Sequence, residues 1–210
     1  MDYSQFKCKW MSKTKIWEVA ERVRNRYWPE NSTPVDVESI IEFRMKITID
    51  VRKGLLSTID MDAFLRLDLT GIIVDEDSYM QEKFASRLRF SFAHELGHYF
   101  LHRGTYTAAD MKTLQEWKEF ILNVPDEEYR NFEWQANEFA GRFLVPRPRL
   151  EIEVDKVTEI ILRKGWKKHL EKDPEAVLSR VSTSICKAFG VSSEVIETRV
   201  RREGLWPPII

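Results

Sequence analysis

The chain has 210 residues, of which 43% are hydrophobic and 12% aromatic, which is enough for one domain or one domain with a small appendage. Its 33 basic and 34 acidic residues give a formal net charge of −1, so there is no global electrostatic case for binding nucleic acid or an anionic membrane. Two isolated cysteines, no apolar leader and no apolar stretch long enough to span a bilayer predict a cytoplasmic protein.

Helices are expected at the start of the chain. Residues 12–28 place apolar side chains on one face of a helix, and Pro29 ends it. A second, shorter helix is predicted over residues 36–43, with Pro34 just before it.

The pattern then changes from helical to extended. Apolar and polar residues alternate from residue 45 to 52, which is typical of a half-buried strand, and residues 63–69 and 71–74 are its expected partners in a small antiparallel sheet. Residues 71–75 directly precede the next helix, so we predict that they form an edge strand that pairs with an extended substrate. The alternative is a fully paired inner strand without a substrate role.

The most informative motif is His94-Glu95-Leu-Gly-His98, within residues 81–102. This stretch has no proline and a helical spacing of apolar residues, which places the motif on a buried helix. Two histidines four positions apart project from one face and can hold one metal ion. In zinc peptidases with this spacing the glutamate stands beside the attacking water and acts as the catalytic base. The alternative, two ordinary helix histidines, would leave buried imidazoles without partners.

A catalytic zinc site takes three protein ligands, so a third must come from elsewhere in the chain. A histidine ten residues after His94 is excluded, because that position is Gly104. Cys8 and Cys186 are isolated and far from the motif in the sequence.

A glutamate on a second predicted helix is the preferred third ligand. Glu133 and Asn137 share a face of that helix, so Glu133 can bind the metal while Asn137 hydrogen-bonds a motif histidine. Alternatively, Glu133 is a solvated carboxylate like its neighbours Glu127 and Glu128.

His102 lies four positions after His98 and therefore on the ligand face, one turn further along. A catalytic site needs an open position for water, so we predict a supporting role behind the ligands in preference to a fourth metal bond. His169 lies in a basic stretch that carries no metal signal.

The rest of the chain is predicted to be helical, over residues 150–163, 174–189 and 193–203. The last two predicted helices, residues 174–189 and 193–203, resemble a helix-turn-helix motif, with Arg199, Arg201 and Arg202 on the second helix. This segment has only a modest excess of basic over acidic residues, which an ordinary solvated helical face would also show. We therefore expect the segment to pack on the body of the molecule in preference to binding DNA. We predict a core of residues 1–148 and a C-terminal helical segment of residues 149–210.

Two blocks of sequence resemble the ImmA/IrrE-type zinc metallopeptidases of bacteria, phages and mobile elements. The blocks are RFSFAHELGHYFLH at residues 89–102 and EWQANEFAGRFLVP at residues 133–146. The resemblance implies that His94, His98 and Glu133 bind Zn²⁺ and that Glu95 is the catalytic base. It also implies an α+β, mainly helical, zincin-like fold.

The resemblance further implies a narrow substrate, a helix-turn-helix transcriptional repressor that is cut to switch on a stress, prophage or mobile-element response. Residues 104–129 are longer than expected between the two blocks and include a predicted helix around residues 111–122, which we interpret as a lid or a substrate-recognition insert.

The predicted function is therefore a zinc endopeptidase. The alternative is a non-catalytic zinc-containing regulator, or a toxin-antitoxin-like partner protein, that binds a repressor without cutting it.

Hydrolysis of a peptide bond by a zinc peptidase also needs a hydrogen-bond donor for the developing oxyanion. The sequence does not choose among the side chains able to serve, which are Arg142, His102, Tyr99, Tyr106 and Tyr129.

Overall fold

The computed structural model describes residues 3–59, 61–109 and 114–208. Its α-helices are α1 (Lys13–Tyr27), α2 (Val37–Ser39), α3 (Leu55–Ile59), α4 (Glu76–Met80), α5 (Ala85–Leu101), α6 (Arg103–Ala109), α7 (Leu114–Asn123), α8 (Asp126–Leu144), α9 (Arg147–Arg163), α10 (Lys167–Lys172), α11 (Pro174–Phe189) and α12 (Ser193–Arg202). A π-helical stretch (Ile40–Arg44) and a 3₁₀ turn (Glu82–Phe84) complete the helical elements described. The strands are β1 (Thr48–Arg52), β2 (Ala63–Leu65) and β3 (Gly71–Asp75). The predicted α+β, mainly helical fold class is confirmed.

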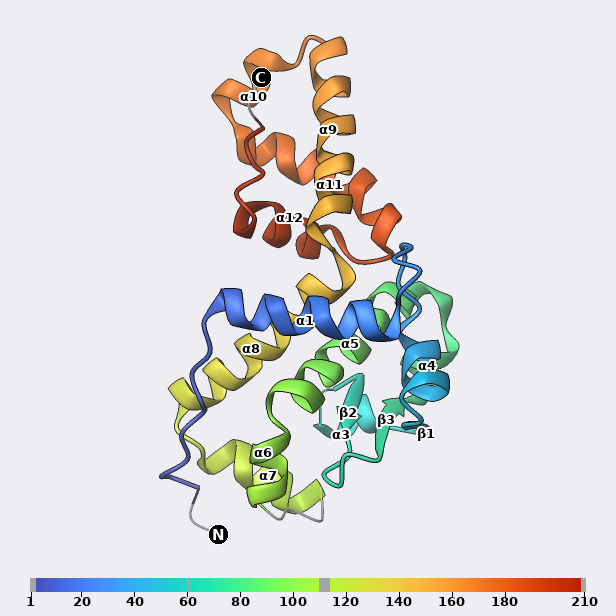
Figure 1. Cartoon of the computed structure of the whole chain (residues 1–210), viewed down its shortest axis with the longest axis vertical. Coiled ribbons are helices and arrows are strands. Elements are labelled where there is room, and N and C mark those ends of the chain that lie inside the picture. The colour runs from blue at the N-terminus through green and yellow to red at the C-terminus, as the bar shows by residue number, and fades with distance from the viewer. Residues whose placement is uncertain (1–2, 60, 110–113, 209–210) are drawn as a thin grey trace.

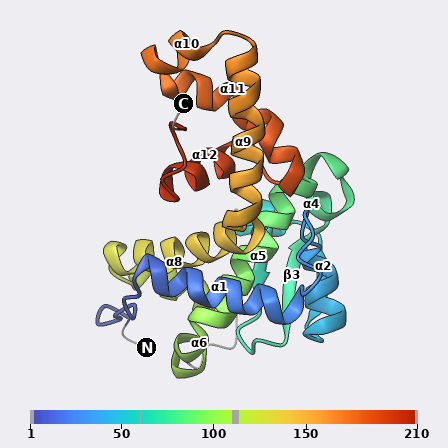
Figure 2. The same cartoon turned by 45° about the horizontal axis from the view of Figure 1, so that its top comes forward.

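The elements form two layers along the long axis of the molecule (Figure 1). The sheet, α1, α5 and α8 make up one end, while α9 to α12 form a helical layer at the other end. Figure 2 shows α1 lying along α8, as in the first view. The predicted division near residue 148 falls in the first turn of α9, which begins at Arg147, and it stays a prediction.

Helices α5 and α8 are the central pair of the fold. Helix α8 begins after Pro125 and carries three acidic residues in its first turn, where carboxylates favour the helix dipole. It ends at Leu144, just before Pro146. The two helices touch backbone to backbone at Gly97, where an added Cβ would lie 2.9 Å from the Cα of Ala136. The glycine of the histidine motif therefore sets the spacing between these helices.

The variant Gly97→Ala should lose about 1–3 kcal/mol of unfolding free energy, because a methyl group there forces α5 and α8 apart. Urea denaturation measures this loss. Gly104→Ala is the matched control, since nothing lies within 4 Å of its added Cβ. If both variants had the same free energy of unfolding, the close contact between Gly97 and Ala136 would not contribute to stability.

The sheet is mixed, with strand order β1-β3-β2. Strand β2 runs antiparallel to β3, as expected, but β1 runs parallel to it. The prediction of a wholly antiparallel sheet is therefore wrong for β1. The reason is the connection, because α3 and then β2 intervene before the chain returns as β3.

Strand β3 is the inner strand, so the prediction that residues 71–75 form the edge beside the motif helix is wrong, and the alternative of a paired inner strand holds. The edge strand next to α5 is β2. Directly after β2, the Arg66 N–H donates to the Gly71 carbonyl of β3, at 2.8 Å. Because pairing alternates along an antiparallel strand, Ala63 and Leu65 direct their backbone groups to the opposite, unpaired side.

The predicted C-terminal helices agree with α9, α11 and α12 to within a few residues. The sequence reading missed α10, whose six residues bury only Leu170 and so show no amphipathic period. No helix within residues 3–59, 61–109 or 114–208 combines the length and the apolarity needed to cross a bilayer.

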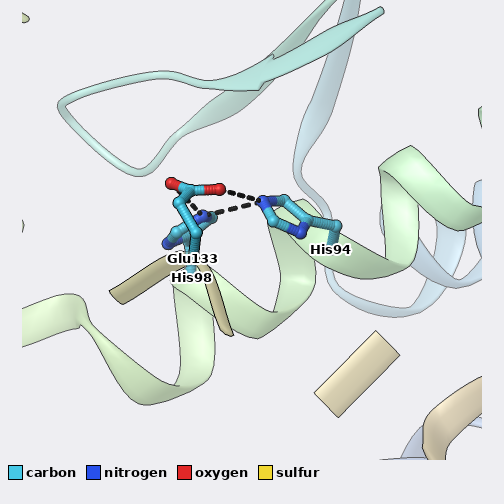
Figure 3. A group of neighbouring side chains, drawn as sticks. All are labelled: His94, His98 and Glu133. Carbon is cyan, nitrogen blue, oxygen red and sulfur yellow. Dashed lines mark hydrogen bonds and ion pairs between the residues drawn. The ribbon is translucent and has the colours of Figure 1, made fainter. Parts of the chain in front are cut away.

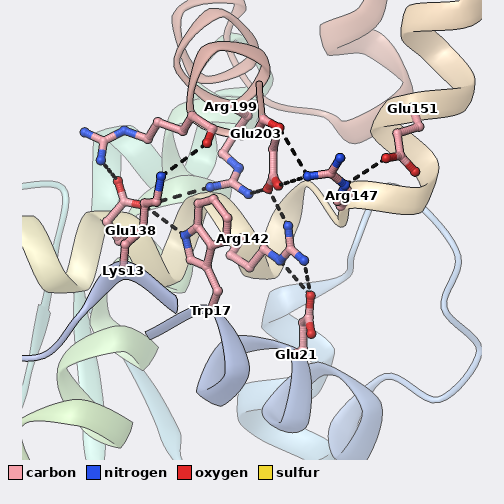
Figure 4. Close-up of polar contacts among 10 residues, drawn as sticks. Lys13, Trp17, Glu21, Glu138, Arg142, Arg147, Glu151, Arg199 and Glu203 are labelled. Atoms are coloured by element: carbon pink, nitrogen blue, oxygen red, sulfur yellow. Dashed lines mark hydrogen bonds and ion pairs between the residues drawn. The ribbon is translucent and has the colours of Figure 1, made fainter. Parts of the chain in front are cut away.

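A buried ion network attaches α12 to the rest of the molecule (Figure 4). The fully buried carboxylate of Glu203 accepts hydrogen bonds from Arg142 of α8, Arg147 of α9 and Arg199 of α12. Trp17 of α1 lies against two of these guanidinium groups, with its ring centroid 4.9 Å from Arg142 and 4.7 Å from Arg199. The network therefore joins four helices that are far apart in the sequence.

The arginines predicted as a possible DNA-binding face are engaged within the protein. Arg199 is buried in the network, Arg201 pairs with Glu175 and Glu197, and Arg202 pairs with Glu138. Guanidinium groups that pair with carboxylates attract phosphate more weakly, and packing in preference to DNA binding stays a prediction.

Candidate metal centre

Three side chains converge where α5 meets α8 (Figure 3). His94 and His98 come from successive turns of α5, and their Nε2 atoms lie 2.9 Å apart. The Glu133 carboxylate reaches across from α8, with Oε2 3.2 Å from His94 Nε2 and Oε1 3.5 Å from His98 Nε2. The structure thus brings together the three residues predicted as metal ligands.

The hydrogen bond behind His94 sets which of its ring nitrogens is free. Its Nδ1 lies 2.9 Å from Oδ1 of Asn137, and an amide oxygen can only accept, so Nδ1 carries the hydrogen and Nε2 keeps a lone pair. Burial lowers the pKa of His94, but the hydrogen bond and charge of Glu133 and the charge of Glu95 outweigh burial and raise it. Asn137 lies where the sequence reading placed it, beside a motif histidine.

A longer chain of hydrogen bonds fixes His98. Gln135 donates through Nε2 to the Lys9 carbonyl at 3.0 Å, which turns its Oε1 toward Nε2 of His102 at 3.2 Å. His102 therefore carries its hydrogen on Nε2 and accepts at Nδ1 from His98 Nδ1, 2.9 Å away. This arrangement leaves Nε2 of His98 with a lone pair that faces His94 and Glu133.

Burial supports these neutral forms. It is the main cause that lowers the pKa of His98 well below its usual value and that lowers the pKa of His102 to about 4. Sequence reasoning assigned His102 a supporting role but missed Gln135. Gln135 lies between Glu133 and Asn137 but on a different face of α8, and its burial shows only in the structure.

The donor set fits a zinc ion. Two lone pairs that face each other at 2.9 Å repel unless they share a proton or a metal ion, and the Glu133 carboxylate adds a negative charge that favours a cation at the same point. Tetrahedral zinc with imidazole ligands separates its nitrogen donors by about 3.3 Å, which lies within the 2.9–3.5 Å spread of the distances found here.

Glu95 lies beside this group and is 6% exposed. Its Oε2 accepts a hydrogen bond of 2.7 Å from the Leu65 N–H, on the unpaired side of β2. Burial raises the pKa of Glu95 to about 7, against the opposing effects of His94 and the Leu65 hydrogen bond. A carboxylate with such a pKa can both take and return a proton near neutral pH.

A cavity of about 340 Å³ opens over these residues. One wall is β2 with the residues just before it, and another comes from the long insert, through Tyr106 of α6 and Trp117 of α7. The rings of Tyr106 and Trp117 stack with their centroids 5.5 Å apart. The start of the helix predicted at residues 111–122 lies partly outside the described residues, and α7 continues it to Asn123.

The family model of the IrrE N-terminal-like domain matches residues 81–201, more than half of the chain. The chain belongs to the M78 peptidase family. The resemblance to ImmA/IrrE-type peptidases is thereby confirmed, and M78 peptidases are generally zinc metalloenzymes. The comparison with curated proteins finds no match.

The structure of this M78 peptidase narrows the candidates for an oxyanion donor. Arg142 is held by Glu21 and Glu203, in the ion network. Tyr106 lines the cavity, and Tyr129 hydrogen-bonds Glu133. Burial, followed by the charges of nearby glutamates, raises the pKa of both phenols, so both keep their hydrogens and can donate.

Proposed function

We propose that this M78 peptidase is a zinc endopeptidase in which His94, His98 and Glu133 hold the metal and Glu95 is the catalytic base. The observation that carries the proposal is the meeting of two oriented Nε2 lone pairs and a carboxylate beside the buried Glu95. A zinc ion, when bound, acts as a Lewis acid that acidifies water and polarises a peptide carbonyl.

The residues of the chain divide the remaining tasks. The unpaired backbone of Ala63 faces the cavity and can pair with an extended peptide, which would place a peptide bond next to Glu95. Glu95 takes a proton from the attacking water and passes it to the leaving amine. Tyr106 or Tyr129 donates a hydrogen bond to the oxyanion.

The substrate we propose is a helix-turn-helix transcriptional repressor, in line with the family to which the chain belongs. The test incubates the purified protein with the repressor encoded beside its gene and with zinc. We expect one discrete cleavage that a chelator abolishes and added zinc restores. A stable complex without cleavage would instead support the alternative of a non-catalytic regulator.

The hydrogen-bond chain behind His98 makes a separate prediction. His102→Ala should weaken zinc binding by about 10- to 100-fold, because His98 loses the partner that fixes its tautomer and ring orientation. Competition with a chromophoric chelator measures the change in affinity. The matched control is His169→Ala, since His169 is exposed on α10. Equal zinc affinity of the two variants would contradict the role of His102.

A further inference from the structure

A second hollow, of about 450 Å³, lies between α8 and α12. Phe90, Glu133 and Asn137 line both this hollow and the cavity over the candidate metal centre. The two spaces therefore meet at the third-ligand glutamate. A peptide that lies along β2 and crosses the metal centre has this hollow on the other side of Glu133.

The walls of the hollow are mainly apolar. Phe90 of α5, Trp134 of α8 and Val195 of α12 are half-buried and contribute their side chains to it. Trp134 and Val195 belong to neither the metal group nor the hydrogen-bond chains behind it. Their exposed apolar surface would be covered favourably by an apolar partner.

The buried charged side chains that line the hollow already lie in ion pairs within the protein, and only Nε and Nη1 of Arg199 are without a hydrogen-bond partner among the described residues. Glu138 accepts a hydrogen bond from the Trp17 indole at 2.9 Å and pairs with Arg202, while Arg199 pairs with Glu203. Because each of these charges already has an opposite charge beside it, a charged ligand would lose its hydration and meet no unpaired counter-charge. At the rim, Arg130 and Glu194 are exposed and opposite in sign, so the rim does not select for charge.

We propose that this hollow is the specificity subsite of the enzyme and receives a large apolar side chain, such as leucine or phenylalanine, from a substrate residue that flanks the scissile bond. This inference rests on the proposed function, because it places the scissile bond at the metal centre. Trp134 and Val195 are the specificity-determining residues. Discrimination between apolar side chains of different size in such a pocket amounts to about 10- to 200-fold.

The test uses peptide hydroxamates that differ only in one side chain next to the metal-binding group, which is that of glycine, leucine, phenylalanine, aspartate or lysine. Inhibitor affinity is measured by calorimetry on the zinc-loaded protein. We expect the leucine and phenylalanine compounds to bind at least tenfold more tightly than the other three. Thr198→Trp, at an exposed position that lines the hollow, should abolish this preference.

Thr183→Trp on α11 is the matched control, because Thr183 is also exposed and does not line the hollow. It should keep the wild-type preference, and Val195→Trp repeats the blocking test at a second position. Hydroxamates that bind without preference, or a preference that survives both blocking variants, would overturn the subsite and leave the zinc site intact.

A separate arm without zinc distinguishes failure of the subsite from failure of the proposed function. N-acetyl-leucinamide is added to the chelator-treated protein, and the methyl signals of Val195 are followed by NMR. Shifts that appear in the wild type and vanish in Thr198→Trp support the hollow even if no hydroxamate binds. No shift, together with no preference among hydroxamates, refutes it.

Discussion

Replacing Glu95 with glutamine should leave the fold and the zinc content unchanged and lower peptide hydrolysis by about 10²- to 10⁴-fold. The glutamine oxygen can still accept the hydrogen bond from Leu65, so the side chain should stay in place. The amide cannot take a proton from water, however, and the general base is lost. Repressor cleavage measures the rate, and elemental analysis measures bound zinc.

Glu82→Gln is the control for this substitution, because Glu82 is exposed at the start of the same helical segment. It should cleave at the wild-type rate. A Glu95→Gln protein that binds zinc and still cleaves normally would exclude Glu95 as the base. A variant that loses zinc would instead show that Glu95 helps to hold the metal.

Glu203→Gln should lower the free energy of unfolding by about 3–5 kcal/mol, the usual cost of breaking a buried ion pair. The Glu203 side chain is 0% exposed and accepts from three arginines. Glutamine removes the negative charge and leaves the buried guanidinium groups of Arg142 and Arg199 undercompensated. Urea denaturation, followed by circular dichroism, gives the unfolding free energy.

Glu151→Gln offers a close comparison, because Glu151 pairs with Arg147, which also binds Glu203. Both members of that pair are 42% exposed, and an exposed pair contributes at most about 1 kcal/mol. If the two variants had the same free energy of unfolding, burial of the Glu203 ion pairs would not contribute to stability.

Residues whose geometry is set within one helix were predictable from the sequence. Helical periodicity alone predicts that His94 and His98 share one face of their helix. It also predicts that Asn137 shares a face with Glu133. The meeting of the two helices was inferred from the need for a third ligand, with Glu133 preferred, and was also implied by the resemblance; the structure shows the contact at Gly97 that permits it.

The order of the strands was not predictable in the same way. Residues 71–75 precede the motif helix in sequence, but α4 intervenes and β2 takes the edge beside α5. Strand neighbours depend on how the chain crosses the sheet, which alternation of apolar residues does not record. The same holds for Arg199, whose basic side chain looks solvent-directed in the sequence and is 2% exposed in the fold.

The position of Glu203 also bears on how the protein is made. Arg142 lies 61 residues before Glu203 in the chain, so its main buried counter-ion leaves the ribosome long after the arginine does. Until then the nascent chain carries the three proposed metal ligands but lacks the carboxylate that pairs with arginines of α8, α9 and α12. The ion network can therefore form only after Glu203 has been synthesised, and a chain that stops before this residue would leave the buried Arg142 without that counter-ion.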